Sequence, residues 1–222
     1  MTKAMIFDAD GTLLDSMGLW RQIDQDFLLA HRYPYLPQIS RQVETMSLRQ
    51  SAAYFQRLLA GREELSVPQI MAELEGMCAG AYENQVQAMP FVPEFLEAAR
   101  RAGYRMCVAT ASQKGQIEKA LGRLGLLSYF SFIMDADEAG ASKTDPAIFL
   151  ACAARLGSVP ADTWVFEDAP HAAKTAADAG FLVVGVHTPE SDGQRERMLG
   201  CCRRWVSSFS QLLDPEKNII LS

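Results

Sequence analysis

The hydrophobic pattern of the first third of the chain predicts one short strand followed by helices. The run Ala4–Phe7 is apolar throughout, which is typical of a buried strand. From residue 17 on, apolar side chains recur every three or four residues, which predicts helices over 17–31, from Ser47 and from Ser66. Both serines stand three residues before a glutamine, as in a capping box. We therefore expect residues 17–88 to be helical, without a strand.

After Pro90, short apolar runs alternate with amphipathic stretches. The apolar runs predict strands at 104–109, 132–134, 163–166, 182–186 and 205–206. The stretches between them predict helices from Val92 to before Gly103, and at 115–124, 145–156 and 172–179. This alternation indicates an α/β fold with a parallel sheet that is covered on both faces. The expected core is therefore discontinuous, residues 1–15 and 91–222, with the helical segment 16–90 inserted after the first strand.

Composition and charge narrow the possible partners. The chain has 222 residues, 49% of them hydrophobic, which suffices for one core domain with an insert. A net charge of −6 without a basic run disfavours nucleic-acid binding. Because no apolar run is long enough to cross a bilayer and the chain starts directly in a strand, we expect neither a membrane segment nor a signal peptide. Five cysteines without paired spacing indicate reduced thiols, so we expect a cytoplasmic protein.

Two aspartates directly after the first strand are the strongest chemical signal. Side chains alternate along an extended chain, so Asp8 and Asp10 would point the same way, just before Gly11. Carboxylates held together at the end of a sheet repel each other unless a cation lies between them. The pair suits a nucleophile and an acid/base beside Mg²⁺. The alternative is a solvated Asp-Gly turn, which is common.

Polar side chains follow three further strands or the connections that leave them. They are Thr110-Ala111-Ser112, Ser142-Lys143-Thr144 and Glu167-Asp168. In open α/β sheets, ligands gather at the carboxyl ends of the strands, so these groups are expected at one site. Each also has a structural interpretation: Ser112 could cap the following helix, Lys143 could be a solvated loop lysine, and the two acids could form an exposed turn.

These motifs, taken in order, resemble the four motifs of the haloacid dehalogenase superfamily of phosphotransferases. Asp-x-Asp-Gly-Thr at 8–12 is similar to the first motif, and the three groups above are similar to the second, third and fourth. One departure is Thr144, where the family more often has proline. The resemblance covers nearly the whole chain and implies a Rossmann-like core with an inserted helical cap, as in phosphatases related to β-phosphoglucomutase and phosphoglycolate phosphatase.

The resemblance also implies a mechanism. Asp8 would attack phosphorus to form an aspartyl phosphate, and Asp10 would act as the acid/base. Mg²⁺ would be bound by the Asp8 side chain, the Asp10 carbonyl and Asp168, with Glu167 acting through a water. The phosphoryl oxygens would be held by Lys143, Thr110 and N–H groups near Ala111.

Several functions are compatible with these motifs. The dehalogenases of the superfamily lack the second aspartate, so Asp10 argues against them. Sugar phosphomutases usually carry a histidine on the first cap helix, where this chain has Trp20. A signalling receiver domain is about half this length and has no helical insert. A module that only binds phosphorylated ligands would not need all the motif residues. We therefore expect a monomeric phosphatase of a small phosphorylated metabolite.

Arg49 is the candidate for recognising the distal part of the substrate. The predicted N-cap at Ser47 places Arg49 in the first turn of a helix, where free N–H groups favour anions. Arginine adds a planar donor suited to a carboxylate or phosphate. The hypothesis implies a substrate with a second anionic group. The alternative is a solvated arginine on the helix surface.

Overall fold

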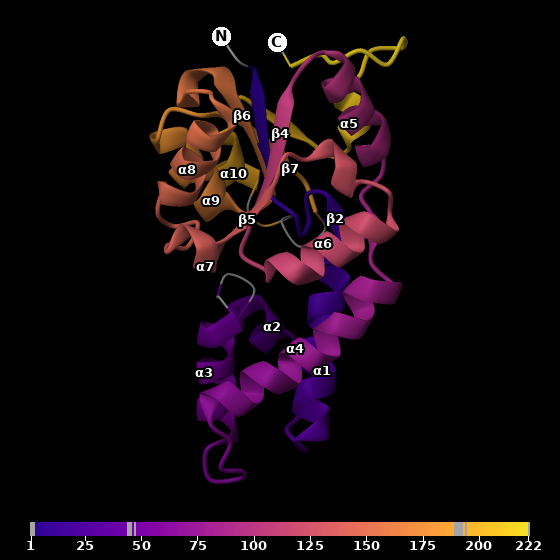
Figure 1. Cartoon of the computed structure of the whole chain (residues 1–222). Helices are drawn as coiled ribbons and strands as arrows, with labels where there is room; N and C mark the ends of the chain where they lie inside the picture. The colour runs from indigo at the N-terminus through magenta and orange to yellow at the C-terminus, as the bar shows by residue number, and fades with distance from the viewer. Residues whose placement is uncertain (1–2, 44–45, 47, 189–192, 194, 222) are drawn as a thin grey trace. The chain divides into compact units, whose positions relative to one another are not determined.

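The structure, a computed structural model, describes residues 3–43, 46, 48–188, 193 and 195–221. The chain forms two compact units (Figure 1). The first, called the core unit here, is made of Met1–Asp15 and Gln87–Ser222. The second, the helical unit, is Ser16–Val86.

A six-stranded parallel sheet forms the centre of the core unit. Its strands are β1 (Ala4–Phe7), β4 (Arg105–Thr110), β5 (Ile133–Asp135), β6 (Thr163–Glu167), β7 (Leu182–Val186) and β8 (Arg204–Val206). They lie in the order β5-β4-β1-β6-β7-β8, and every neighbouring pair is parallel. The predicted α/β fold with a parallel sheet is confirmed. Because β1 lies between β4 and β6, the residues after these three strands end side by side.

Helices cover both faces of this sheet. Along its chain order the core unit contains α5 (Val92–Arg101), α6 (Lys114–Arg123), α7 (Ala136–Ala139), α8 (Ala147–Leu156), α9 (Pro170–Asp178) and α10 (Arg195–Leu199). Short 3₁₀ turns lie at η1 (Leu127–Tyr129), η2 (Pro160–Asp162) and η4 (Phe209–Leu212). Figure 1 shows α8, α9 and α10 on one side of the sheet and α5 and α6 on the other.

The alternation of β1 side chains builds both halves of the hydrophobic core. Ala4 and Ile6 belong to the cluster beneath α8 and α9, which includes Phe149. On the opposite face, the Phe7 ring stacks on Phe166 with centroids 4.5 Å apart. All these side chains are buried. The tight packing on both faces fixes β1, and therefore the start of the aspartate motif that follows it.

The helical unit consists of α1 (Met17–Ala30), α2 (Pro37–Val43), α3 (Leu48–Leu59) and α4 (Val67–Asn84). The predicted capping box at Ser66 is present, since its hydroxyl accepts from the Gln69 N–H and the Gln69 side chain accepts from the Ser66 N–H. The rings of Phe27 and Phe55 pack with centroids 5.1 Å apart between α1 and α3. The predicted cap at Ser47 lies outside the described residues.

Within the segment 17–88, helix α2 was not predicted separately and one expectation was wrong. Helix α2 begins at Pro37, and proline is favoured in the first turn of a helix. Gln87–Ala88 is not helical but forms strand β3, paired antiparallel with β2 (Leu14–Asp15). Among the described residues, no helix has the length and apolar character needed to cross a membrane.

Candidate active site

The segment after β1 is a tight turn that presents two aspartates. The Asp8 N–H donates to the Phe166 carbonyl at 2.9 Å, so Asp8 continues the pairing of β1 with β6. The chain then turns, with the Gly11 N–H donating to the Leu14 carbonyl at 2.8 Å. Gly11 has a φ of 77°, a conformation that side chains other than glycine's disfavour. The Asp-x-Asp-Gly spacing therefore places Asp8 directly after β1, next to β6, and Asp10 in the turn.

Lys143 comes from the connection between β5 and α8 and is buried among acids. Its Nζ donates to Oε1 of Glu167 at 2.7 Å and also contacts Oδ1 of Asp8. The Lys143 side chain is only 6% exposed. The interpretation as a solvated loop lysine is therefore wrong. A buried ammonium bound to two carboxylates links the loop after β5 to the ends of β1 and β6.

Three carboxylates meet at this point and could hold a cation. One side-chain oxygen from each of Asp8, Glu167 and Asp168 lies within 4.8 Å of the others. All three residues are buried, which excludes an exposed acidic turn at Glu167-Asp168. Oε2 of Glu167 is buried and has no hydrogen-bond partner among the described residues. Because such an oxygen needs a partner and Mg²⁺ prefers carboxylate oxygens, the residues present fit this ion.

The charge balance of the cluster agrees with a divalent cation. With all three carboxylates ionised, the Lys143 ammonium would leave two negative charges uncompensated. Burial raises the pKa of Asp8 to about 8, although the attraction of Lys143 lowers it. Burial also raises the pKa of Asp168 well above its usual value. The raised pKa values express the cost of holding these charges in the interior, which a dication would offset.

The surroundings of Lys143, unlike those of the two acids, favour the charged form of the side chain. Burial alone would lower its pKa, but the charges of Asp8 and Glu167 and the hydrogen bonds to them raise its pKa above the usual range. Lys143 therefore stays protonated at neutral pH. A permanent positive charge next to Asp8 suits the binding of a phosphoryl group, whose oxygens are negative.

The Thr110-Ala111-Ser112 turn follows β4, the neighbour of β1. Thr110 is buried, and its Oγ1 accepts the Ser112 N–H at 3.0 Å. The Ser112 hydroxyl donates to Oδ2 of Asp10 at 2.6 Å. Helix α6 begins two residues later with Gln113 as its N-cap, so the interpretation of Ser112 as the helix cap is wrong. The link from Ser112 to Asp10 was missed, because no sequence signal joins positions that far apart.

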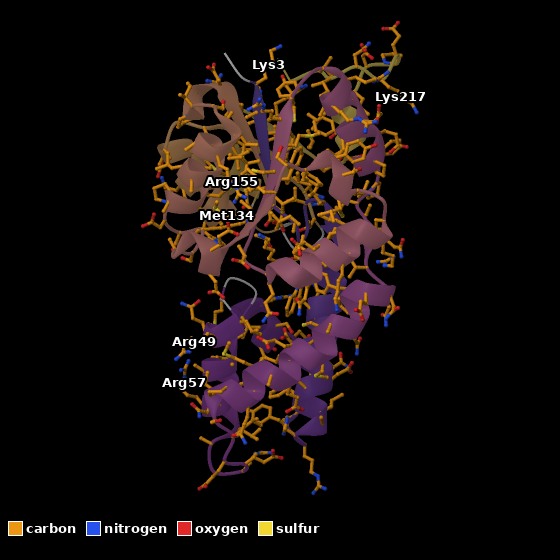
Figure 2. All side chains as sticks on the ribbon, viewed as in Figure 1. Lys3, Arg49, Arg57, Met134, Arg155 and Lys217 are labelled. Carbon is orange, nitrogen blue, oxygen red and sulfur yellow. The ribbon has the colours of Figure 1, made fainter. Side chains whose placement is uncertain are left out.

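The predicted site residues therefore fall into two groups. The structure brings together Asp8, Lys143, Glu167 and Asp168, and a hydrogen bond joins Asp10 to the turn after Thr110. Arg49 is exposed on α3 of the helical unit, where Figure 2 shows it extending outward from the ribbon, as does Arg57. Its role toward a substrate stays a prediction.

Residues 2–180 match the profile of a family described as haloacid dehalogenase-like hydrolases. The chain is 25% identical to the phosphorylated carbohydrates phosphatase of Thermotoga maritima, over 86% of this chain and 88% of that protein. It is 27% identical to hexitol phosphatase B of Escherichia coli K12, over 94% and 93%. Its fold superposes on CbbY of Rhodobacter sphaeroides in complex with xylulose-1,5-bisphosphate with a TM-score of 0.81, at 22% identity over 99% and 100% of the chains.

Proposed function

The chain belongs to the haloacid dehalogenase-like hydrolase family, as a phosphoric monoester hydrolase, and we propose that it is a Mg²⁺-dependent phosphatase acting through an aspartyl phosphate. Phosphorylated sugars and sugar alcohols are the first substrate class to consider, because two relatives are named for them. The observation that carries the proposal is the buried cluster of Asp8, Glu167 and Asp168 around the Lys143 ammonium.

Asp8 is the proposed nucleophile. In the first step its carboxylate attacks phosphorus, an O–P bond to Asp8 forms, and the bond from phosphorus to the leaving oxygen breaks. Asp10 donates its proton to that leaving oxygen, so an alcohol departs rather than an alkoxide. In the second step Asp10 takes a proton from water as the water attacks phosphorus, and Asp8 is released with inorganic phosphate.

The remaining residues hold charge in place. Lys143 binds phosphoryl oxygens while it stays next to Asp8, and Thr110 can donate its hydroxyl proton to another oxygen. Asp8, Asp168, the Asp10 carbonyl and, through a water, Glu167 would hold Mg²⁺, which would neutralise charge on the phosphoryl group. Because phosphoryl transfer depends mostly on positioning and charge, these parts suffice for catalysis.

A phosphate-release screen tests the proposal. The purified chain is incubated with phosphorylated sugars, sugar alcohols, nucleotides and small acids, with Mg²⁺ and with excess chelator. We expect inorganic phosphate from at least one sugar or sugar-alcohol phosphate with Mg²⁺ only. Full activity in chelator would reject the metal, and an isomeric sugar phosphate formed without inorganic phosphate would indicate a phosphomutase instead.

A further inference from the structure

Ser112 and Asp10 are joined by a short hydrogen bond between two loops that are far apart in sequence. The Ser112 hydroxyl lies 2.6 Å from Oδ2 of Asp10, across a sequence separation of 102 residues. Both residues belong to the core unit, and they follow the adjacent strands β4 and β1. The contact is therefore a product of the sheet order.

Both partners of this hydrogen bond lie in turns that further contacts hold in place. The Ser112 N–H donates to Oγ1 of the buried Thr110, which fixes the turn after β4. Asp10 forms a bridge with Leu14 in the turn after β1, where Gly11 takes its left-handed conformation. The two turns therefore hold the serine hydroxyl against Oδ2 of Asp10.

We propose that Ser112 is a positioning residue for Asp10, a role that rests on the proposed phosphatase function. A carboxyl group carries its proton on one of two oxygens, and an oxygen that already accepts a hydrogen bond is the poorer place for it. With Oδ2 held by Ser112, Asp10 carries its transferable proton on Oδ1. Rotation that would exchange the two oxygens breaks the bond to Ser112, so the acid keeps one orientation toward the leaving oxygen.

This role makes the effect of Ser112 depend on the leaving group. Phenyl phosphate releases a basic phenolate that needs protonation, whereas p-nitrophenyl phosphate releases a stable nitrophenolate that needs little. The ratio kcat/KM reports the steps up to formation of the aspartyl phosphate, so slow hydrolysis of that intermediate does not mask the comparison. A direct contact of Ser112 with the phosphoryl group would instead affect both substrates alike.

The experiment compares kcat/KM for these two substrates in the wild type and in Ser112→Ala. We expect Ser112→Ala to lower kcat/KM for phenyl phosphate by about tenfold or more, because general acid catalysis is worth about 10²–10⁴-fold, and p-nitrophenyl phosphate by less than about twofold. Ser112→Thr, which keeps the hydroxyl, should restore kcat/KM for phenyl phosphate. Ser210→Ala is the matched control, since the Ser210 hydroxyl, in η4 of the same unit, likewise donates a hydrogen bond to a side chain, that of Ser208.

A double-mutant cycle completes the test. In the Asp10→Asn background, Ser112→Ala should lower kcat/KM for phenyl phosphate no further, because the acid it positions is gone. Additive losses, or an equal loss for both substrates, would overturn the inference while the proposed function stands. If the wild type releases phosphate from neither compound nor from the screen, the proposed function itself fails. Should Ser112→Ala not fold, Ser112→Cys provides the same comparison with a weaker donor.

Discussion

The Lys143 ammonium donates to the Glu167 carboxylate at 2.7 Å, and both side chains are buried at the carboxyl end of the sheet. The same ammonium contacts Asp8, so one cation links the proposed nucleophile to a proposed metal-site acid. A buried positive charge of this kind is costly unless it is compensated on several sides. Its retention in the interior therefore indicates a site built to hold negative charge.

Replacing Lys143 is expected to remove most of the activity. Lys143→Met keeps the length of the side chain but leaves Asp8 without its positive partner, and we expect kcat to fall by about 10²-fold or more, the usual cost of a lost electrostatic contact in a site. Lys114→Met is the control, because Lys114 forms an exposed ion pair with Glu138 at 3.1 Å. Comparable turnover in the two variants would contradict a role of Lys143 in catalysis.

The stabilisation by Mg²⁺ is expected to grow with pH. Because burial raises the pKa of Asp8 to about 8, the folded protein without a cation keeps a proton there that the unfolded chain loses above about pH 3.8. Asp8 alone therefore makes the folded protein without a cation less stable as pH rises from about 4 to about 8. Below about pH 8, a bound Mg²⁺ must displace the proton on Asp8.

Thermal melts measure this directly. The increase in Tm caused by Mg²⁺ should be larger at about pH 8 than at about pH 6, since metal binding competes with protonation of the ligand. Asp8→Asn should show a smaller increase that depends less on pH than in the wild type, with the remaining dependence coming from Asp168. An increase in Tm that is the same at both pH values in the wild type would contradict the proposed ligand set.

A second pH dependence is expected in the helical unit, at the end of α1. His31 lies between two acids, with Nδ1 2.7 Å from Glu63 and Nε2 3.0 Å from Glu73, and its ring packs on Phe27. Burial alone would lower the pKa of His31, but the hydrogen bonds and charges of the two acids raise it above 6.5. Stability from these contacts is then fully present below pH 6.5 and is lost as pH rises through the folded-state pKa.

Urea unfolding of the wild type and His31→Gln tests this contribution. The difference in unfolding free energy should be largest near about pH 6 and should shrink toward about pH 9. Glu73→Gln, which removes one of the two acids, should reduce the dependence on pH. A difference that stays constant or grows with pH would mean that protonated His31 does not stabilise the helical unit.

Arg49 is expected to act on substrates with a second anionic group. Arg49→Ala should raise KM for the best such substrate by about tenfold, the usual worth of one charged hydrogen bond, while p-nitrophenyl phosphate should barely respond. Arg57→Ala is the matched control, because Arg57 is also exposed on α3 and lies over the Tyr54 ring. If both substrates respond to Arg49→Ala alike, or neither does, Arg49 does not determine specificity.

The six strands of the parallel sheet, and the motifs that follow them, were predictable because each of these strands contains a short apolar run. β7 was predicted with its observed bounds, and Phe7, the last residue of β1, directly precedes the two aspartates. Helix α2 was not predictable in the same way, since only seven residues carry its pattern and its first residue is a proline. A short helix of this kind depends on packing in the helical unit rather than on its own propensity.

The partners of the site residues could not be predicted from local sequence. The motifs indicated Asp8, Lys143 and Asp168 as candidate site residues. The hydrogen bond from Lys143 to Glu167, however, depends on how the loop after β5 folds back to the sheet. Likewise, Ser112 reaches Asp10 only because β4 is the neighbour of β1. Contacts between distant segments come from the sheet order, which periodicity does not specify.

The identity of the residue that carries phosphorus during turnover tests directly whether Asp8 is the nucleophile. The Asp10→Asn variant is mixed with p-nitrophenyl phosphate and Mg²⁺, quenched in acid, digested and analysed by mass spectrometry. We expect one phosphoryl group on Asp8, formed with an equal amount of p-nitrophenol, and neither product in Asp8→Asn. Release of p-nitrophenol without a phosphoryl group on Asp8, or wild-type turnover in Asp8→Asn, would contradict this role of Asp8.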